Sequence, residues 1–248
     1  MKLPVIRGLI DRRILVNFRV HPNVLSRLTP APFRPKLVNG FGMAGVCMIR
    51  LKQTRPRLLP AFLGLTSENA AHRIAVEWEE NGETKQGVFV PRRDTSSRIN
   101  AFAGGRLFPG VQNHASFLVH EHDDHYRVEL KSDDQHTHLM VEGHLARELT
   151  PNSVFGTLNE ASRFFELGSV GYSTASDPDK FDGIELHSFN WRVDPLEVLK
   201  VTSSFFDDRK LFPSGSVEFD SALLMRGIDH EWRGKSCLTA TTETGRKP

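Results

Sequence analysis

Three arginines lie close together where a strand-like run meets a proline. The segment FVPRRDTSSR covers residues 89–98 and holds Arg92, Arg93 and Arg98, with one carboxylate, Asp94, among them. A guanidinium binds carboxylate or phosphate oxygens through two parallel hydrogen bonds. Such a cluster at the end of a strand predicts a concave site for a small anionic molecule.

Arg92 and Arg93 cannot both enter one pocket directly, because successive side chains of a strand point to opposite faces. We expect one of them in the pocket and the other in an ion pair with an acidic residue such as Asp94 or Glu77. A structural alternative stays open, in which Glu68, Asp94 and the arginines satisfy one another, since buried charges are usually paired.

A second group of polar residues lies in the run TSENAAHRIAVEW, residues 66–78. Glu68, Ala70 and His72 share one face if this run is a strand. We predict that Glu68, with His72 beside it, moves a proton as a general acid or base. His72 is also interpretable as a hydrogen-bonded core histidine, and that alternative stays open.

Histidines are concentrated between residues 120 and 138. Pairs at positions i and i+2 on a strand could hold a metal, but alternating polar residues are also typical of a solvent-exposed face. We therefore expect neither a metal nor another cofactor. The histidines concerned are His120, His122, His125, His136 and His138.

The elements that must position these residues are mainly strands. Alternating runs flank Asn81-Gly82, the preferred pair for a tight hairpin turn, and predict a central hairpin over 73–91. A helix is expected at 22–29, and another at 157–167, where Thr157 and Glu160 form a capping box. Further strands are expected at 14–20, 41–51, 114–122, 125–132, 137–146, 183–193 and 216–226. The run at 194–206 is compatible with a helix or a strand, and we favour a strand.

No repeat or linker divides the chain, so we expect one domain over 1–240 and a disordered tail over 241–248. Basic and acidic residues are interspersed, with a net charge of +2, which argues against a nucleic-acid partner. No apolar stretch reaches the ~18 residues of a membrane span. Without a secretory signal, and with two cysteines outside any redox spacing, the chain is expected to be cytoplasmic. Association into a homo-oligomer stays open.

Several segments resemble a known superfamily. Residues 12–33, RRILVNFRVHPNVLSRLTPAPF, and residues 66–78 are similar to segments of the acetoacetate decarboxylase-like superfamily, and VPRR at 90–93 falls where the decarboxylases carry Y-P-K-K. The combination of SENAAHRIAVEW, VPRRDTSSR, FNW and SVEFDSALLMRG resembles an uncharacterised bacterial branch of it, a domain of unknown function. The resemblance implies an antiparallel β cone or barrel around an internal pocket, with a few short helices outside.

The resemblance also implies site residues. In the decarboxylases the first lysine of P-K-K forms the Schiff base, whereas this chain has Arg92 and Arg93, which cannot form an imine. Glu68 matches the pocket glutamate of the family. The pocket arginine of the family falls by count on Asp11, with Arg12 and Arg13 adjacent. The residues expected to bind substrate are Arg92, Arg93, Arg98, Arg13, Asn69 and Asp94.

Two functions are compatible with these observations. One is an enzyme of lyase, hydratase or isomerase type that acts on a small keto-acid-like molecule without a Schiff-base lysine. The other is a non-catalytic binding or scaffold protein that retains the pocket. A carboxyl group in a cavity at Glu68 would favour the enzyme, and a Glu68 held in a bidentate arginine pair would favour the second function.

Overall fold

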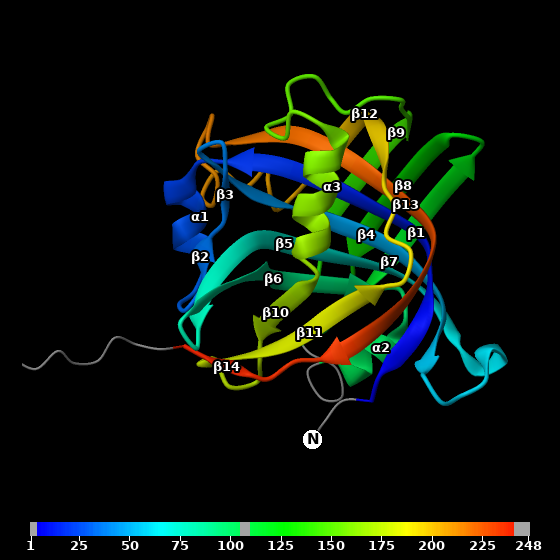
Figure 1. Cartoon of the computed structure of the whole chain (residues 1–248). Coiled ribbons are helices and arrows are strands. Elements are labelled where there is room, and N and C mark those ends of the chain that lie inside the picture. The colour runs from blue at the N-terminus through cyan, green and yellow to red at the C-terminus, as the bar shows by residue number, and fades with distance from the viewer. Residues whose placement is uncertain (1–3, 105–109, 241–248) are drawn as a thin grey trace, which may run out of the picture.

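A computed structural model describes residues 4–104 and 110–240. The expected tail over 241–248 lies outside the described residues. In the described part the fold is mainly β, with most strand pairs antiparallel and a few short helices around them (Figure 1). The helices are α1 (Pro22–Leu28), α2 (Arg98–Ala103) and α3 (Leu158–Leu167), with a 3-10 turn, η1, at Ala61–Leu63.

The strands of the described residues form one curled sheet, in which many strands pair with their neighbours in the chain while others, such as β1 with β13, pair across long distances in sequence. They are β1 (Ile6–Val20), β2 (Arg34–Pro35), β3 (Leu37–Val38), β4 (Phe41–Pro56), β5 (Leu65–Glu80), β6 (Glu83–Thr95), β7 (Gln112–His122), β8 (His125–Ser132), β9 (His138–Leu145), β10 (Val170–Thr174), β11 (Lys180–Ser188), β12 (Asp194–Ser203), β13 (Val217–Gly234) and β14 (Leu238–Thr239).

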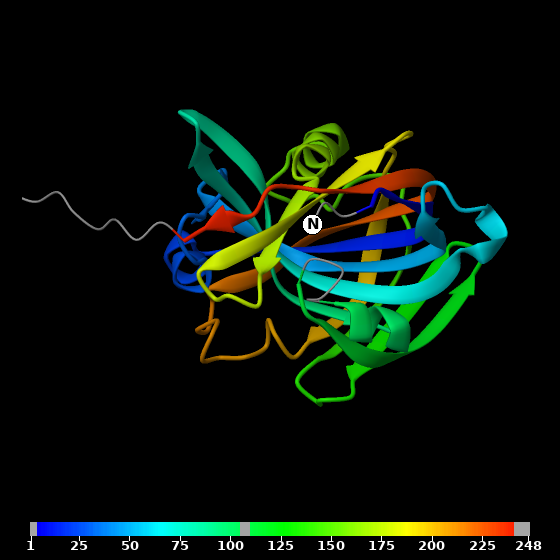
Figure 2. The ribbon, with the colours of Figure 1, turned by 90° about the horizontal axis from the view of Figure 1, so that it is seen from below.

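The pairings close two rings that share one wall. The wall consists of β13, β1, β4, β5 and β6, in that order. On one side β7, β8, β9 and β12 close the first ring, and on the other β10 and β11 close the second through pairs with β6 and β13. Figure 2 shows the blue and cyan strands of the wall between the green strands on one side and the yellow β11 with α3 on the other.

Both faces of the wall are buried along the middle of β1 and β4, which explains the apolar runs at 14–16 and 42–49. Ile14 and Val16 of β1 belong to the core enclosed by the first ring, together with Val128 and Leu130 of β8. Leu15, between them in sequence, belongs to a second core under α3. We call these the first-ring core and the second-ring core.

Local sequence signals place several elements where they were expected. Asn81 and Gly82 have φ of 54° and 77°, as the tight hairpin between β5 and β6 requires. Thr157 and Glu160 form both hydrogen bonds of the capping box before α3. At Gly45 of β4 an added Cβ would collide with the backbone oxygen of Val16, so glycine permits the close approach of β1 and β4.

Several expectations differ from the structure. The strand expected over 194–206 ends at Ser203. The strand expected over 183–193 ends at Ser188, because the chain turns so that Trp191 folds into the second-ring core, where its indole Nε1 donates to Ser162 Oγ over 3.0 Å. The helix α2 was not expected. It follows a cap in which the Ser97 hydroxyl accepts a hydrogen bond from the backbone N–H of Asn100.

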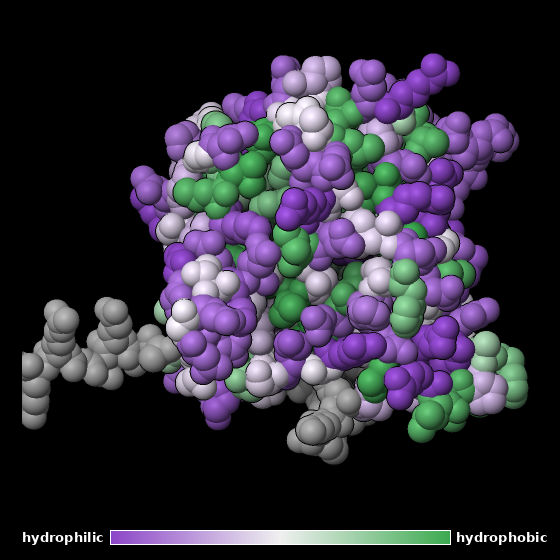
Figure 3. Space-filling view, viewed as in Figure 1, coloured by the Kyte–Doolittle hydropathy of each residue, from purple (hydrophilic) through white to green (hydrophobic). Residues whose placement is uncertain are grey.

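The face in Figure 3 is mostly hydrophilic, with apolar residues interspersed. Apolar side chains gather at its lower right, over the connection between β4 and β5, where Leu58 is 91% exposed and Phe62 is 83% exposed. Among the described residues no helix is long and apolar enough to cross a membrane.

Candidate anion-binding cavity

Strand register brings polar residues from four strands onto one face of the wall. Arg13 of β1 lies opposite Ile49 of β4, which lies opposite Asn69 of β5. One step along, Cys47 of β4 lies opposite Ala71 of β5, which lies opposite Arg93 of β6. These side chains face the second ring, beneath α3.

A cavity of about 190 Å³ opens on this face. It is larger than the ~150 Å³ cavity that holds a benzene ring. Much of its wall is apolar and is formed by side chains of α3 and β11 together with Trp191 and Trp232. The lining residues with polar side chains include Arg13, Arg73, Arg93, Asn69, Asn100 and Cys47, and the apolar ones include Phe165, Ile184, Leu186, Trp191 and Trp232.

The three cavity arginines have neutral hydrogen-bond partners. The Nε of Arg13 donates to Cys47 Sγ over 3.1 Å. Arg73 donates from Nη2 to Asn17 Oδ1, and Arg93 donates from Nε to Ser173 Oγ over 3.1 Å. Within residues 4–104 and 110–240, none of the three guanidiniums forms an ion pair with a carboxylate.

Two of these guanidiniums also carry buried N–H groups without a partner. The atoms are Nε of Arg73 and Nη2 of Arg93. Arg73 is 7% exposed and lies 4.7 Å from the centre of the Phe165 ring. Burial lowers the pKa of Arg73 and of Arg93 to about 10, so both stay cationic at neutral pH. The cavity therefore concentrates positive charge that the described protein groups leave uncompensated.

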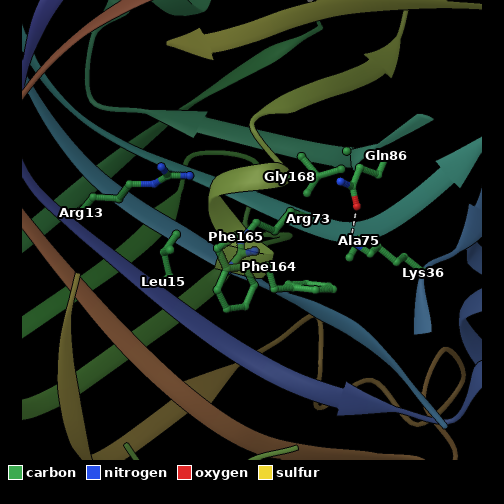
Figure 4. A pocket seen from close by; sticks show the side chains of 11 residues that line it. Arg13, Leu15, Lys36, Arg73, Ala75, Gln86, Phe164, Phe165 and Gly168 are labelled. Atoms are coloured by element: carbon green, nitrogen blue, oxygen red, sulfur yellow. Dashed lines mark hydrogen bonds between the residues drawn. The ribbon is translucent and has the colours of Figure 1, made fainter. Parts of the chain in front are cut away.

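A smaller hollow of about 30 Å³ adjoins the cavity and shares Arg13 and Arg73 with it (Figure 4). Lys36 lies on its rim. Its ammonium donates to Gln86 and lies 4.5 Å from the centre of the Phe164 ring. Burial lowers the pKa of Lys36. No lysine stands out in the sequence as buried, and Lys36 becomes visible only through the packing of α3.

Arg92 lies on the opposite face of β6 from Arg93. It donates from Nη2 to Asp94 Oδ1 over 2.7 Å, and its Nη1 lies 3.0 Å from Asp134 Oδ2. Burial raises the pKa of Asp94, and the Arg92 guanidinium opposes that shift. Glu77, the alternative partner, pairs with Arg34 instead.

Glu68 is held in an ion-pair cluster on the face of β5 away from the arginine-lined cavity. Its two oxygens accept from Arg12 Nη2 over 2.5 Å and from Arg50 Nε over 2.6 Å. Both arginines also bind Glu121. The residues that line the cavity in the described chain do not include Glu68. Of the arginines near the start of β1, Arg12 thus pairs with Glu68 and Arg13 faces the cavity.

His72 lies in the first-ring side of the wall and is 1% exposed. Its ring centre is 4.9 Å from that of Phe205, and neither ring nitrogen has a hydrogen-bond partner. Burial, with a smaller contribution from Arg92, lowers the pKa of His72 to about 3. The side chain is therefore a neutral core histidine at neutral pH, without the hydrogen bond that the core interpretation assumed.

The remaining candidates divide between the cavity and the surface. Asn69 lines the cavity and accepts from Thr95 Oγ1 over 2.8 Å. Arg98 is the exposed first residue of α2. Histidines 125 and 138 lie beside separate carboxylates, Glu142 and Glu129. The described residues contain no group of three or more His, Cys, Asp or Glu side chains that could hold a metal.

Sequence reasoning missed Arg73, Cys47 and Asn100. The signal for Arg73 was present, because Asn69, Ala71 and Arg73 alternate on one face of β5 just as Glu68, Ala70 and His72 do on the other. Cys47 and Asn100 had no local signal, since only the register and the position of α2 bring them to the cavity.

A family model of uncharacterised conserved proteins, DUF2071, matches residues 10–224. The chain belongs to the DUF2071 family. No curated protein matches the chain in sequence.

Solved structures of acetoacetate decarboxylase-like proteins share the fold. The acetoacetate decarboxylase of Legionella pneumophila has a TM-score of 0.62 at 10% identity, covering 94% of this chain and 86% of that one. An acetoacetate decarboxylase-like enzyme from Sphingomonas wittichii has a TM-score of 0.60 at 14% identity, covering 96% and 94%. The enduracididine biosynthesis enzyme MppR, solved with pyruvate, has a TM-score of 0.64 at 9% identity, covering 97% and 91%. The DUF2071 chain thus has an acetoacetate decarboxylase-like fold.

Proposed function

We propose that the cavity binds a small organic acid of the keto-acid class through Arg13, Arg73 and Arg93. The observation that carries this proposal is the set of three guanidiniums around one cavity without a carboxylate partner among the described residues. An uncompensated buried charge is costly. A bound carboxylate would supply the missing charge and accept from the free N–H groups of Arg73 and Arg93.

The size and lining of the cavity support a small, partly apolar acid. About 190 Å³ holds a molecule with few non-hydrogen atoms, and the tryptophans and Phe165 offer apolar contact to its non-acidic end. MppR shares the fold, and one of its solved structures is a complex with pyruvate. That precedent supports pyruvate and acetoacetate as the first compounds to examine.

Residues 92 and 93 cannot form an imine with a bound keto acid, because a guanidinium is not a nucleophilic amine. Proton transfer by Glu68 and His72 has little support in the geometry. Glu68 is bound to two arginines, and His72 is enclosed in the first-ring core. A reaction of lyase, hydratase or isomerase type would have to use groups of the cavity itself.

A non-catalytic binding or scaffold role is the second candidate function. The pairing of Glu68 with Arg12 and Arg50 favours it, because both oxygens of this carboxylate are already occupied by guanidiniums and are not free to contact a ligand. Proton NMR of pyruvate in D₂O separates the two functions. Exchange of the methyl protons catalysed by the protein would support an enzyme that enolises keto acids.

Isothermal calorimetry with pyruvate tests the binding proposal. We expect pyruvate to bind, the neutral amide pyruvamide to bind at least about tenfold more weakly, and Arg93→Gln to weaken pyruvate binding by a similar factor. The matched control is Arg98→Gln, which removes an exposed arginine that does not line the cavity. Equal affinity for pyruvate and pyruvamide, or an unchanged affinity in Arg93→Gln, would refute the proposal.

A further inference from the structure

Cys47 carries a thiol that lines the cavity and that the proposed binding does not use. It lies in the middle of β4, is 7% exposed, and lines the cavity between Leu15 of β1 and Ala71 of β5. Its place follows from the register of the wall, which puts Ala71 between Cys47 and Arg93.

The sulfur of Cys47 contacts one cavity arginine and lies near the other two. Arg13 donates to Sγ over 3.1 Å. Burial lowers the pKa of Arg73 and Arg93, and the negative charge that Cys47 can carry opposes that shift at both, which reflects their proximity to the sulfur. Arg73 is more than nine-tenths buried and keeps an unpartnered Nε beside the same cavity. The thiol and the free anion-binding groups therefore belong to one site.

A small acid held by these guanidiniums would bring its next carbon close to Sγ. In an α-keto acid the carbonyl carbon is bonded directly to the carboxylate carbon, so that fixing the carboxylate also fixes the electrophile. Holding two reacting groups together replaces a bimolecular encounter by a local one. The oxygen that becomes negative on attack would meet cationic N–H donors, as in an oxyanion hole.

We propose that Cys47 forms a reversible covalent adduct with the α-keto acid bound in the cavity. This inference rests on the proposed function. The sulfur attacks the keto carbon, a bond between Sγ and carbon forms, and the π bond of the carbonyl group breaks. The electron pair goes to the carbonyl oxygen, which takes the proton that the thiol gives up. The product is a thiohemiketal, the net addition of S–H across C=O, and no oxidant or second reactant is needed.

The adduct would let this chain bind a keto acid covalently through a thiol, whereas the decarboxylases that it resembles are expected to use a lysine amine. Arginine at positions 92 and 93 removes the amine, and Cys47 supplies a nucleophile from the other end of the same row of residues. The thiohemiketal keeps its C–C bonds and returns the keto acid on reversal.

Alkylation of the wild-type protein tests the site without any mutation. Iodoacetate carries a carboxylate, whereas iodoacetamide is its neutral counterpart. Both alkylate the thiol: a bond from their CH₂ carbon to sulfur forms, and iodide and the thiol proton are released. We expect iodoacetate to modify Cys47 about tenfold faster than iodoacetamide, and excess pyruvate to slow the reaction. Cys237, which is exposed, is the internal control and should show no preference for iodoacetate. Peptide mass spectrometry measures both sites in one sample.

A Cys47 that shows the same preference as Cys237, or that iodoacetate leaves unmodified in the folded protein, would overturn the inference. An Arg93→Gln protein should lose most of the preference for iodoacetate at Cys47. Retention of the full preference in that variant would also count against the site.

Carbon-13 NMR with pyruvate labelled at the keto carbon tests the adduct itself. We expect a protein-bound resonance of a tetrahedral carbon in the wild type and its absence in Cys47→Ser, with Cys47→Ala as a second variant if the serine protein does not fold. Calorimetry on the same samples separates the two levels of the argument. Pyruvate binding without the tetrahedral resonance overturns the adduct and leaves the proposed function intact. No binding of pyruvate to the wild type overturns both.

Discussion

Arg92 and Arg93 are neighbours in the chain but lie on opposite faces of β6 and have opposite electrostatic surroundings. Arg92 is paired with Asp94 at 2.7 Å and with Asp134 at 3.0 Å. Arg93 donates to the hydroxyl of Ser173 and leaves Nη2 buried without a partner. The pair separates a structural arginine from one available to a ligand, and each prediction about the site depends on that separation.

Arg92→Gln is expected to lower the free energy of unfolding by about 3 kcal/mol, because it leaves the buried Asp94 carboxylate without its cation. Arg93→Gln removes a charge that has no carboxylate partner among the described residues, so it should be neutral or stabilising in the absence of ligand. Urea denaturation of both variants measures the difference. A larger loss in Arg93→Gln than in Arg92→Gln would contradict the assignment of the two faces.

Glu68→Gln is expected to destabilise the protein by about 2–4 kcal/mol while leaving the affinity for pyruvate unchanged. The substitution breaks two charge-assisted hydrogen bonds, from Arg12 and Arg50, and leaves the buried Arg12 with Glu121 as its remaining anionic partner among the described residues. Chemical denaturation gives the first quantity and calorimetry the second. An unchanged stability together with lost binding would return Glu68 to the site.

The wild-type protein should give no borohydride-trapped adduct with acetoacetate, because residues 92 and 93 provide no amine. Arg92→Lys should not change this, since its side chain faces away from the cavity. Arg93→Lys would place an amine inside the cavity, where burial and the neighbouring Arg13 and Arg73 lower the pKa of a lysine. We expect an adduct in Arg93→Lys alone, measured by intact mass.

A trapped adduct on a lysine of the wild type would contradict that prediction. Lys36 is the residue to examine first, because it lies on the rim of the adjoining hollow and burial lowers its pKa. Peptide mapping would locate the modified lysine.

Acid should destabilise the fold through two buried histidines. Burial lowers the pKa of His72 to about 3 and that of His230 to about 4, whereas both have a pKa of 6.5 as free side chains. Between those values the unfolded chain binds protons that the folded chain does not, so stability is complete above pH 6.5 and falls as the pH is lowered. Each histidine contributes a slope of about 1.4 kcal/mol per pH unit.

Unfolding by urea at pH 7 and at pH 5 measures this dependence. His72→Leu should remove about half of the loss between the two pH values, whatever its effect on stability at pH 7. His120→Leu is the matched control, because His120 is exposed and its replacement leaves both buried histidines in place. The same pH dependence in His72→Leu and the wild type would be inconsistent with the buried neutral state.

The elements with local signals were predictable from the sequence. The Asn81-Gly82 turn and the capping box before α3 are fixed by residues a few positions apart. The closure of the two rings was not, because the parallel pairing of β6 with β10 and the pairing of β11 with β13 join segments more than 40 residues apart, without a motif to mark them. The resemblance of the chain to the superfamily implied a cone or barrel around one internal pocket, but not the pairings that close it into two rings.

The cavity face was harder to predict than the fold. Alternation placed Glu68 and His72 together and Asn69 and Arg73 together, but a strand buried on both faces gives no sign of which face holds a cavity. The position of α3 over one face decides it. Four of the expected binding residues line the cavity, namely Arg13, Asn69, Arg93 and Asp94, although the Asp94 carboxylate is paired with Arg92; Arg92 and Arg98 do not line it.

The shared wall has a consequence for how the chain can change in length. Removal of one residue within β5 would shift every following side chain to the other face. That shift would carry Arg73 into the first-ring core and His72 into the cavity, so a single deletion would damage both rings at once. The exposed connection around η1 has no such alternation to preserve. Its residues form no strand pairs with either ring, and its side chains are largely in solvent. Evolutionary insertions and deletions are therefore expected to gather in that connection and to spare the wall.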